Sequence, residues 1–140
     1  MSTSLSPFHI ALLEFLMTAK QGLMGVGKIY DLTPIQATTL ALIDKEHPKP
    51  MNTFQKLYNC DASNVTGIVD GLEEKHLAIR GEHPADRRVK TILLTDEGAK
   101  VQAQLIDSIT DIDHTILGDL TQEDLAAFKS IILKLSKQDK

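Results

Sequence analysis

Acidic and basic side chains gather at the start of an apolar stretch in the second half of the chain. Asp86 is followed at once by Arg87 and Arg88, and then by Val89-Lys90-Thr91-Ile92-Leu93-Leu94, a run that favours a β-strand. Guanidinium groups bind phosphate oxygens and base edges, and a neighbouring carboxylate can orient them. This pattern is typical of a β-hairpin that contacts nucleic acid.

A helix with one polar face is expected upstream of these arginines, over residues 61–75. One of its sides has apolar residues at three- and four-residue spacing, namely Val65, Ile68, Val69 and Leu72. The other side has small or short polar residues, namely Ser63, Asn64, Thr66, Gly67, Asp70 and Gly71. Helices that enter the DNA major groove have such a pair of faces. Short polar residues also favour any helix start, so each one alone says little.

Composition favours a single domain with its own hydrophobic core. The chain has 140 residues, of which 42% are hydrophobic, and its formal net charge at pH 7 is −4. Between Asn52 and Lys90, however, six basic residues balance six acidic ones, and three of the bases fall in residues 87–90. We therefore expect phosphate contacts to be concentrated at the hairpin. The lack of tryptophan argues against an aromatic platform for single strands.

Hydrophobic periodicity and helix caps predict the order α-α-α-α-β-β-α-α. Helices are expected from Pro7 to about Met24, where Gly22 and Gly25 would fray the end, and then over residues 33–45, 51–58, 61–75, 95–116 and 121–135. In the third helix, Phe54 and Leu57 are expected to face inward. Strands are expected over residues 77–80 and 89–94, joined by a long tip over residues 81–88. The tail, residues 137–140, is expected to be disordered.

The chain resembles the MarR (multiple antibiotic resistance regulator) family from Leu5 to Lys137. The resemblance rests on four segments that occur in register, namely Ser63-Asn64-Val65-Thr66, Leu72-Glu73-Glu74-Lys75, Asp86-Arg87-Arg88 and Leu94-Thr95-Asp96-Glu97-Gly98. They match the family patterns Ser-x-Val-Thr, Leu-Glu-Glu-Lys, Asp-x-Arg and Leu-Thr-x-x-Gly. The resemblance implies one mainly α domain with a small β-wing, in which about residues 33–95 form a winged helix-turn-helix and about residues 5–30 and 96–137 form dimerisation helices.

The resemblance also implies a homodimeric transcriptional regulator, usually a repressor, that binds a pseudo-palindromic operator in double-stranded DNA. A small aromatic or phenolic effector would relieve repression from a pocket lined by the first, second and fifth helices. Carried over by position, the recognition-helix residues that would approach bases and phosphates are Ser63, Asn64, Thr66 and Gly67. Arg88 would enter the minor groove, Arg87 and Lys90 would touch phosphates, and Asp86 would orient an arginine of the wing.

Three positions depart from the family pattern. Gly71 and Gly81 stand where basic residues are frequent, and His76 stands where a glycine usually ends the recognition helix. We therefore expect DNA binding that is weaker than in a typical member and that depends more on the wing and on DNA shape. Gly71, Gly81 and the net charge of −4 motivate an alternative, a winged-helix dimer that serves as a protein-interaction or ligand-binding module with little DNA affinity.

Cys60 is the only cysteine, so an intrachain disulfide and a four-cysteine zinc site are excluded. A thiol just before a helix can sense oxidants, but the favoured interpretation of Cys60 is a small buried apolar residue in the turn between two helices. Asp107, Asp111 and His114 can share one helix face at metal-ligand spacing, but exposed acids on a long helix explain them too. We expect neither metal nor cofactor.

No catalytic motif of the common nucleotide-binding, zinc peptidase or serine hydrolase types occurs, so an enzyme is not expected. The N-terminal sequence lacks the pattern of a signal peptide, and no apolar run is long enough to span a membrane. We therefore expect a cytoplasmic protein without a membrane partner.

Overall fold

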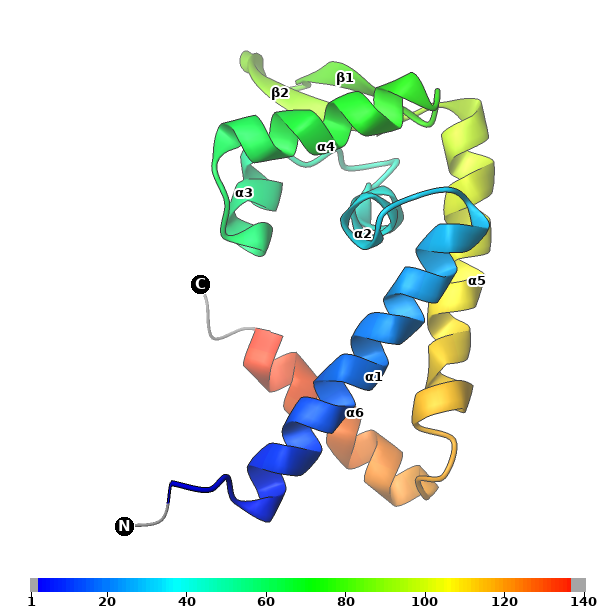
Figure 1. The fold of residues 1–140 in the computed structure, drawn as a ribbon. Helices are drawn as coiled ribbons and strands as arrows, with labels where there is room; N and C mark the ends of the chain where they lie inside the picture. The colour runs from blue at the N-terminus through cyan, green and yellow to red at the C-terminus, as the bar shows by residue number, and fades with distance from the viewer. Residues whose placement is uncertain (1–2, 137–140) are drawn as a thin grey trace. The chain divides into compact units, whose positions relative to one another are not determined.

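The computed structural model describes residues 3–136, and its elements follow the predicted order (Figure 1). The helices are α1 (Pro7–Ile29), α2 (Pro34–Leu42), α3 (Asn52–Tyr58), α4 (Ala62–Glu74), α5 (Asp96–Ile116) and α6 (Gln122–Ser136). The strands are β1 (Ala78–His83) and β2 (Asp86–Leu94). Residues 137–140, predicted to be disordered, lie outside the described part. None of the helices over residues 3–136 is long and apolar enough to cross a bilayer.

Two compact units divide the chain, residues 1–109 and 110–140, and α5 contributes to both. The core of the first unit is formed by fully buried side chains from α2, α4, β2 and α5, namely Leu40, Val65, Val69, Leu72, Ile92 and Leu105. Burial of these side chains is the main favourable contribution to folding of the unit. The alternation of buried and exposed positions along α4 leaves its polar face toward solvent.

The inward-facing residues of α3 differ from the prediction. Phe54 is buried, with 2% of its surface exposed, but Leu57 is 56% exposed, so its predicted core position is wrong. Tyr58 packs inward instead and shares a 2.6 Å hydrogen bond with the Thr39 hydroxyl of α2. Burial raises the pKa of Tyr58. A tyrosine with a buried partner for its hydroxyl therefore anchors α3 against α2.

Helix α1 extends five residues beyond the predicted end near Met24, to Ile29. Gly25 and Gly27 lie inside the helix, and Gly27 is buried where the chain turns back, with its carbonyl accepting from the Leu32 amide at 2.8 Å. A Cβ at position 27 would lie 2.5 Å from the Leu32 carbonyl oxygen. Close packing of the following turn therefore outweighs the low helix propensity of glycine here.

Helix α2 ends at Leu42, three residues before the predicted end at Lys45. Asp44 is responsible, because its carboxylate accepts from the amides of Glu46 and His47 at 2.9 and 3.0 Å. These hydrogen bonds also lower the pKa of Asp44. An aspartate that bonds to its own following backbone stops a helix by offering an alternative turn.

The strands of the hairpin are longer, and its tip shorter, than predicted. β1 and β2 pair antiparallel from Ala78 with Leu94 through Glu82 with Lys90, and the ladder closes with His83 opposite Asp86. The tip is therefore a turn at residues 84–85 rather than the predicted loop over residues 81–88. Between the last two pairs, β1 has no intervening residue whereas β2 has residues 87–89, so β2 is bulged at this point.

A non-glycine residue with left-handed backbone closes α4. His76 has a φ of 60°, its amide donates to the Glu73 carbonyl at 2.9 Å, and the next amide, of Leu77, donates to Leu72 at 3.0 Å. This is the hydrogen-bond pattern of the Schellman motif, whose left-handed position is usually glycine. The chain therefore ends α4 in the way that the family pattern predicts, although a histidine in place of glycine makes the left-handed backbone less favourable.

We expect His76→Gly to raise the free energy of unfolding by about 1 kcal/mol, because glycine adopts a positive φ without steric cost. Urea unfolding followed by circular dichroism measures the change. Glu74→Gly is the matched control, since the same glycine inside the last helical turn should lower stability by a similar amount. A destabilised His76→Gly would contradict the backbone argument.

Candidate nucleic-acid interface

The N-terminal end of α4 is held by a capping aspartate. Asp61 has an extended backbone, and its Oδ1 accepts from the Asn64 amide at 2.9 Å and from the Ser63 hydroxyl at 2.8 Å. The exposed residues on the following turns are the ones predicted to contact DNA, namely Ser63, Asn64, Thr66 and Gly67. The hydrogen bond to Asp61 therefore fixes the orientation of the Ser63 hydroxyl, and the sequence alone did not predict this bond. The Ser63 oxygen can still accept a hydrogen bond from DNA.

Hydrogen bonds from Asn64 and Ser63 hold the pKa of Asp61 below its usual value. A lowered folded-state pKa means that this carboxylate stabilises the protein at neutral pH and that its contribution disappears as pH falls through the folded pKa. Asn caps helices about as well as Asp but does not titrate. We expect Asp61→Asn to lose less thermal stability than wild type between about pH 5 and pH 3, as calorimetry would measure. Parallel stability curves would contradict this linkage.

Gly71, which stands where basic residues are frequent in the family, has a role in the packing of α4. A Cβ at this position would collide with the side-chain amide of Gln36, whose Oε1 accepts from the Thr33 amide at 3.0 Å at the start of α2. The Thr33 hydroxyl in turn accepts from the Gln36 amide at 3.2 Å, which completes a capping box. Glycine on α4 therefore lets the capped end of α2 pack closely against it.

Arg80 of β1 binds two acidic residues of α4. Its guanidinium donates to Asp70 Oδ1 at 2.6 Å and pairs through its other terminal nitrogen with Glu73 Oε1. Asp70 and Glu73 are one helical turn apart, so a single planar guanidinium can reach both. This clamp, Arg80 with Asp70 and Glu73, neutralises acidic groups beside the polar face of α4. Sequence reasoning missed it, although an arginine on the strand after an acidic helix end is a usable signal.

The wing presents its arginines from the bulge in β2. Arg87 and Arg88 lie among the unpaired residues of the bulge, and Arg88 is 91% exposed at its side chain. Asp86 accepts from the Arg88 amide at 3.0 Å and from the guanidinium at 3.1 and 3.2 Å. These bonds lower the pKa of Asp86. Lys90, the first residue after the bulge, is also exposed. The geometry therefore projects Arg88 to solvent with its guanidinium oriented by a carboxylate.

All of the predicted DNA-contact residues belong to the first unit, from two elements that Figure 1 shows side by side, α4 and the hairpin. Cys60 lies in the turn between α3 and α4, is half-buried, and donates its amide to the Gln55 carbonyl at 3.0 Å. Within the described residues, no three histidine, cysteine, aspartate or glutamate side chains gather as metal ligands would.

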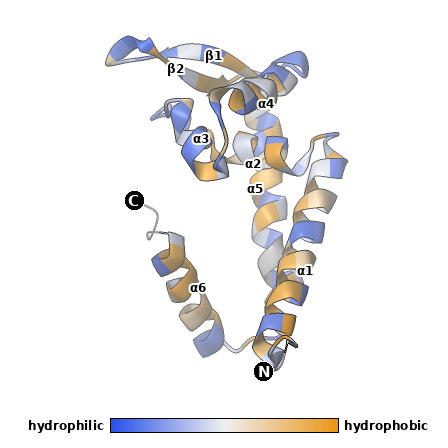
Figure 2. Ribbon diagram, turned by 60° about the vertical axis from the view of Figure 1, so that its left-hand side comes forward, coloured by the Kyte–Doolittle hydropathy of each residue, from blue (hydrophilic) through white to orange (hydrophobic). Residues whose placement is uncertain are grey.

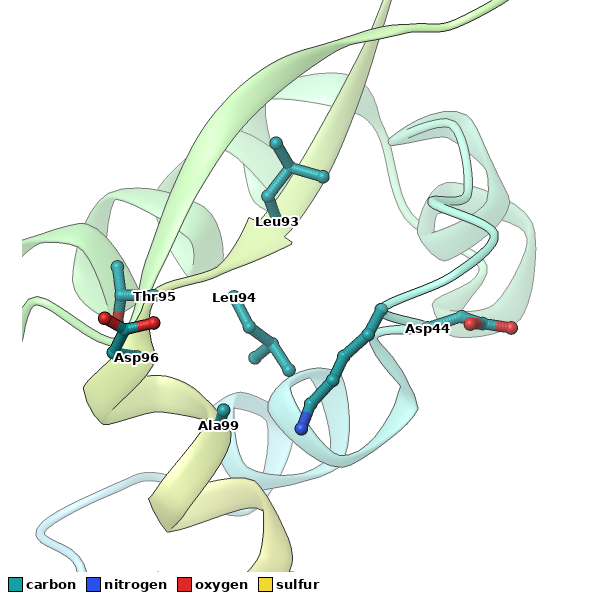
Figure 3. Close-up of a pocket in the computed structure, with 7 residues that line it drawn as sticks. Asp44, Leu93, Leu94, Thr95, Asp96 and Ala99 are labelled. Atoms are coloured by element: carbon teal, nitrogen blue, oxygen red, sulfur yellow. The ribbon is translucent and has the colours of Figure 1, made fainter.

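A cavity of about 420 Å³ opens in the first unit at the base of the wing (Figure 3). It is lined by the loop after α2, the end of β2 and the start of α5, through residues Asp44, Lys45, Leu93, Leu94, Thr95, Asp96 and Ala99. Figure 3 places the carboxylates of Asp44 and Asp96 on opposite sides of Leu94. A cavity of this size, lined by both apolar and polar residues, is typical of sites for small ligands.

Comparisons with known proteins agree with this geometry. The model of the MarR family matches residues 32–90, which span α2 to the bulge of β2. The HTH-type transcriptional repressor MdtR of Bacillus subtilis is 30% identical over 106 residues, which cover 76% of this chain and 68% of the repressor.

Solved structures match nearly the whole fold. CouR from Rhodococcus jostii, bound to p-coumaroyl-CoA, superposes with a TM-score of 0.82 at 19% identity and covers 98% of this chain and 97% of its own. A cysteine-to-serine mutant of MarR from E. coli, complexed with operator DNA, superposes with a TM-score of 0.74 at 21% identity, over 92% and 93% of the two chains. These likenesses confirm the winged-helix fold. The chain therefore belongs to the MarR family of transcriptional regulators, which are DNA-binding proteins and not enzymes.

Proposed function

We propose that the protein is a homodimeric repressor that binds a pseudo-palindromic operator in double-stranded DNA and is released by a small effector. The observation that carries this proposal is the exposed guanidinium of Arg88, oriented by Asp86 in the same unit as the exposed polar face of α4. The operator complex of MarR and the repressor role of MdtR support it.

In the proposed complex, α4 lies in the major groove and the wing lies along the neighbouring minor groove. The base and phosphate contacts from α4 come from Ser63, Asn64, Thr66 and Gly67. Arg88 enters the minor groove, and Arg87 and Lys90 bind phosphates. Because α4 has no basic residue between Asp61 and Lys75, most of the electrostatic contribution comes from the wing. Sequence preference then depends in part on minor-groove width.

Dimerisation through α1, α5 and α6 is supported by large hydrophobic side chains that are exposed in the single chain. Figure 2 shows the hydrophobic residues that recur along α1 and α6. On α1 they include Phe8, Ile10, Leu13, Leu16 and Met17, and on α6 they are Ile131, Ile132, Leu133 and Leu135. Exposed apolar surface of this extent usually marks an interface. Light scattering on the purified protein should give twice the chain mass of 15.4 kDa.

The effector is proposed to be a small aromatic or phenolic compound. Such a ligand releases DNA if it binds better to a dimer whose recognition helices no longer match successive grooves, because only differential affinity shifts an equilibrium. The crystal structure of CouR with p-coumaroyl-CoA supports an aromatic ligand. The cavity at the wing base has a suitable size, about 420 Å³, for a small aromatic ring.

Titration of DNA from the protein's own upstream region tests the proposal directly. Saturable binding that exceeds binding to unrelated DNA of equal length, and that weakens about tenfold or more from 50 to 200 mM salt, is the expected result. A protein that shows no saturable binding at low salt would instead support the interaction-module alternative.

Oxidation of Cys60 is a second proposed route to release, since the residue lies two positions before α4. Attack of the Cys60 thiolate on peroxide would form a sulfenic acid and release hydroxide, and the added oxygen at this half-buried position would displace the capped helix start. Peroxide treatment should then weaken operator binding by wild type and leave Cys60→Ser unaffected. Equal responses of the two proteins would rule this route out.

A further inference from the structure

Gln102 of α5 is a buried polar side chain with an unusual set of partners. Only 6% of its surface is exposed. Its Nε2 donates to the main-chain carbonyls of Leu40 at 3.0 Å and Ile43 at 2.7 Å, and the Ala41 carbonyl lies at 3.5 Å. Two of these carbonyls belong to the last turn of α2, and the third belongs to Ile43, the residue that follows it. A side chain from α5 therefore caps a helix that lies about sixty residues earlier in the sequence.

The end of α2 needs such a cap. The last carbonyls of a helix lack partners within the helix, and α2 is followed by Ile43 in extended conformation rather than by a left-handed glycine. Its last turn has no basic side chain, and the Ile43 amide reaches the Leu40 carbonyl only at 3.4 Å. Because Leu40 and Ile43 are buried, water has little access to their carbonyls. Gln102 therefore supplies donors that nothing nearby replaces.

Three buried positions on one face of α5 hold it to the rest of the first unit. Gly98 lies so close to the Leu77 main chain that a Cβ would collide with the Leu77 carbonyl. Gln102 follows one turn later, and Leu105, fully buried, one turn after that. Beyond Leu105, none of the described positions of α5 is buried. We call Gly98, Gln102 and Leu105 the anchor of α5. Gln102 is the only one of the three whose side chain forms hydrogen bonds, and these bonds restrict the position of α5 more than apolar contacts do because they depend on direction.

We propose that Gln102 is a positioning residue, which fixes the direction in which α5 leaves the first unit. Through α5 it would set the separation of the two recognition helices in the dimer, and this second step rests on the proposed function. Loss of its donors should leave the first unit folded, while the packing of α5 against the end of α2 loosens and the helix direction becomes less defined.

The first step is tested within one chain. Spin labels at Lys56→Cys and Ser108→Cys, in a Cys60→Ser background diluted with unlabelled protein, report the distance from α3 to the part of α5 that follows Leu105 within the first unit. Gln102→Met keeps the length of the side chain but has no donor, and we expect it to widen the distance distribution about twofold. The matched control is Gln104→Met, an exposed glutamine on the same helix, which should keep the original width.

An unchanged width in Gln102→Met would overturn the proposal. If this variant does not fold, Gln102→Asn, whose amide is one methylene too short to reach both carbonyls, is measured instead and should also widen the distribution. The width does not depend on DNA, so it tests the positioning role even if the wild-type protein binds no operator.

The second step is tested with operators whose half-sites are moved apart by one base pair. Wild type and Gln104→Met should lose about tenfold or more in affinity, whereas Gln102→Met should lose less than about threefold, because recognition helices that are less fixed tolerate either spacing. A merely structural role would weaken binding to both operators equally. Equal discrimination by all three proteins would refute the spacing role.

Discussion

We expect Arg88→Ala to weaken operator binding about 10- to 100-fold, which corresponds to about 1–3 kcal/mol, because Arg88 is the residue proposed to enter the minor groove. The physical reason is that Arg88 combines exposure with orientation. Its guanidinium projects from the bulge in β2, and Asp86 restricts its rotamers before DNA arrives. Fluorescence anisotropy with labelled operator at several salt concentrations measures the loss, and the salt slope should fall by about one.

Arg87→Ala is the matched control for this prediction. Arg87 lies beside Arg88 in the bulge, is equally a base, and has no carboxylate partner assigned to it among the described contacts. As a phosphate contact it should contribute a smaller and sequence-independent amount, a loss of about two- to fivefold. Equal losses in the two variants would mean that the wing acts only through its charge. If Arg88→Ala binds the operator as tightly as wild type, the wing does not contribute to the interface with DNA through Arg88.

Orientation by Asp86 can be separated from the charge of Arg88. Asp86→Asn keeps an acceptor for the Arg88 amide but removes the charge-assisted bonds that lower the pKa of Asp86. If orientation matters, this variant binds operator less tightly than wild type although the wing has become more positive. A gain in affinity would show that net charge dominates over orientation.

Local signals in the sequence predicted the order of the elements and the caps of most helices. Thr33 with Gln36, Asp61 and Thr121 each form the predicted bond at a helix start, because capping depends only on residues three positions apart. His76 adopts the left-handed backbone expected where the family has glycine. These caps and the left-handed residue depend on side chains within one helical turn, so they can be predicted from the sequence alone.

Features that depend on distant partners were not predicted. Gln102, some sixty residues after α2, caps the last carbonyls of that helix, and Tyr58 rather than Leu57 packs inward because its hydroxyl bonds to Thr39 of α2. Likewise, the bulge that exposes the arginines follows from strand register, which residue types alone do not fix. The sequence therefore named the candidate DNA-contact residues, which stay a prediction, but it did not give their arrangement, and the clamp of Arg80 with its two acids was missed.

Arg80→Ala should weaken operator binding about tenfold or more, although Arg80 is not proposed to touch DNA. In the structure its guanidinium neutralises Asp70 and Glu73 beside the face of α4 proposed to enter the major groove. Without it, two carboxylates face the phosphates with no counter-charge, and like charges at an interface are costly. Folding stability should change little, because partly exposed ion pairs contribute about 0–1 kcal/mol.

The triple variant Arg80→Ala, Asp70→Asn, Glu73→Gln distinguishes neutralisation from direct contact. It lacks the guanidinium and also the two charges that the guanidinium neutralises, so the clamp predicts that operator affinity returns to within about threefold of wild type. Thermal unfolding of each variant shows whether its fold is retained. If the triple variant binds as weakly as Arg80→Ala, Arg80 contacts the DNA itself. Recovery would instead explain how a recognition helix without a basic residue, in a protein of net charge −4, can approach a polyanion.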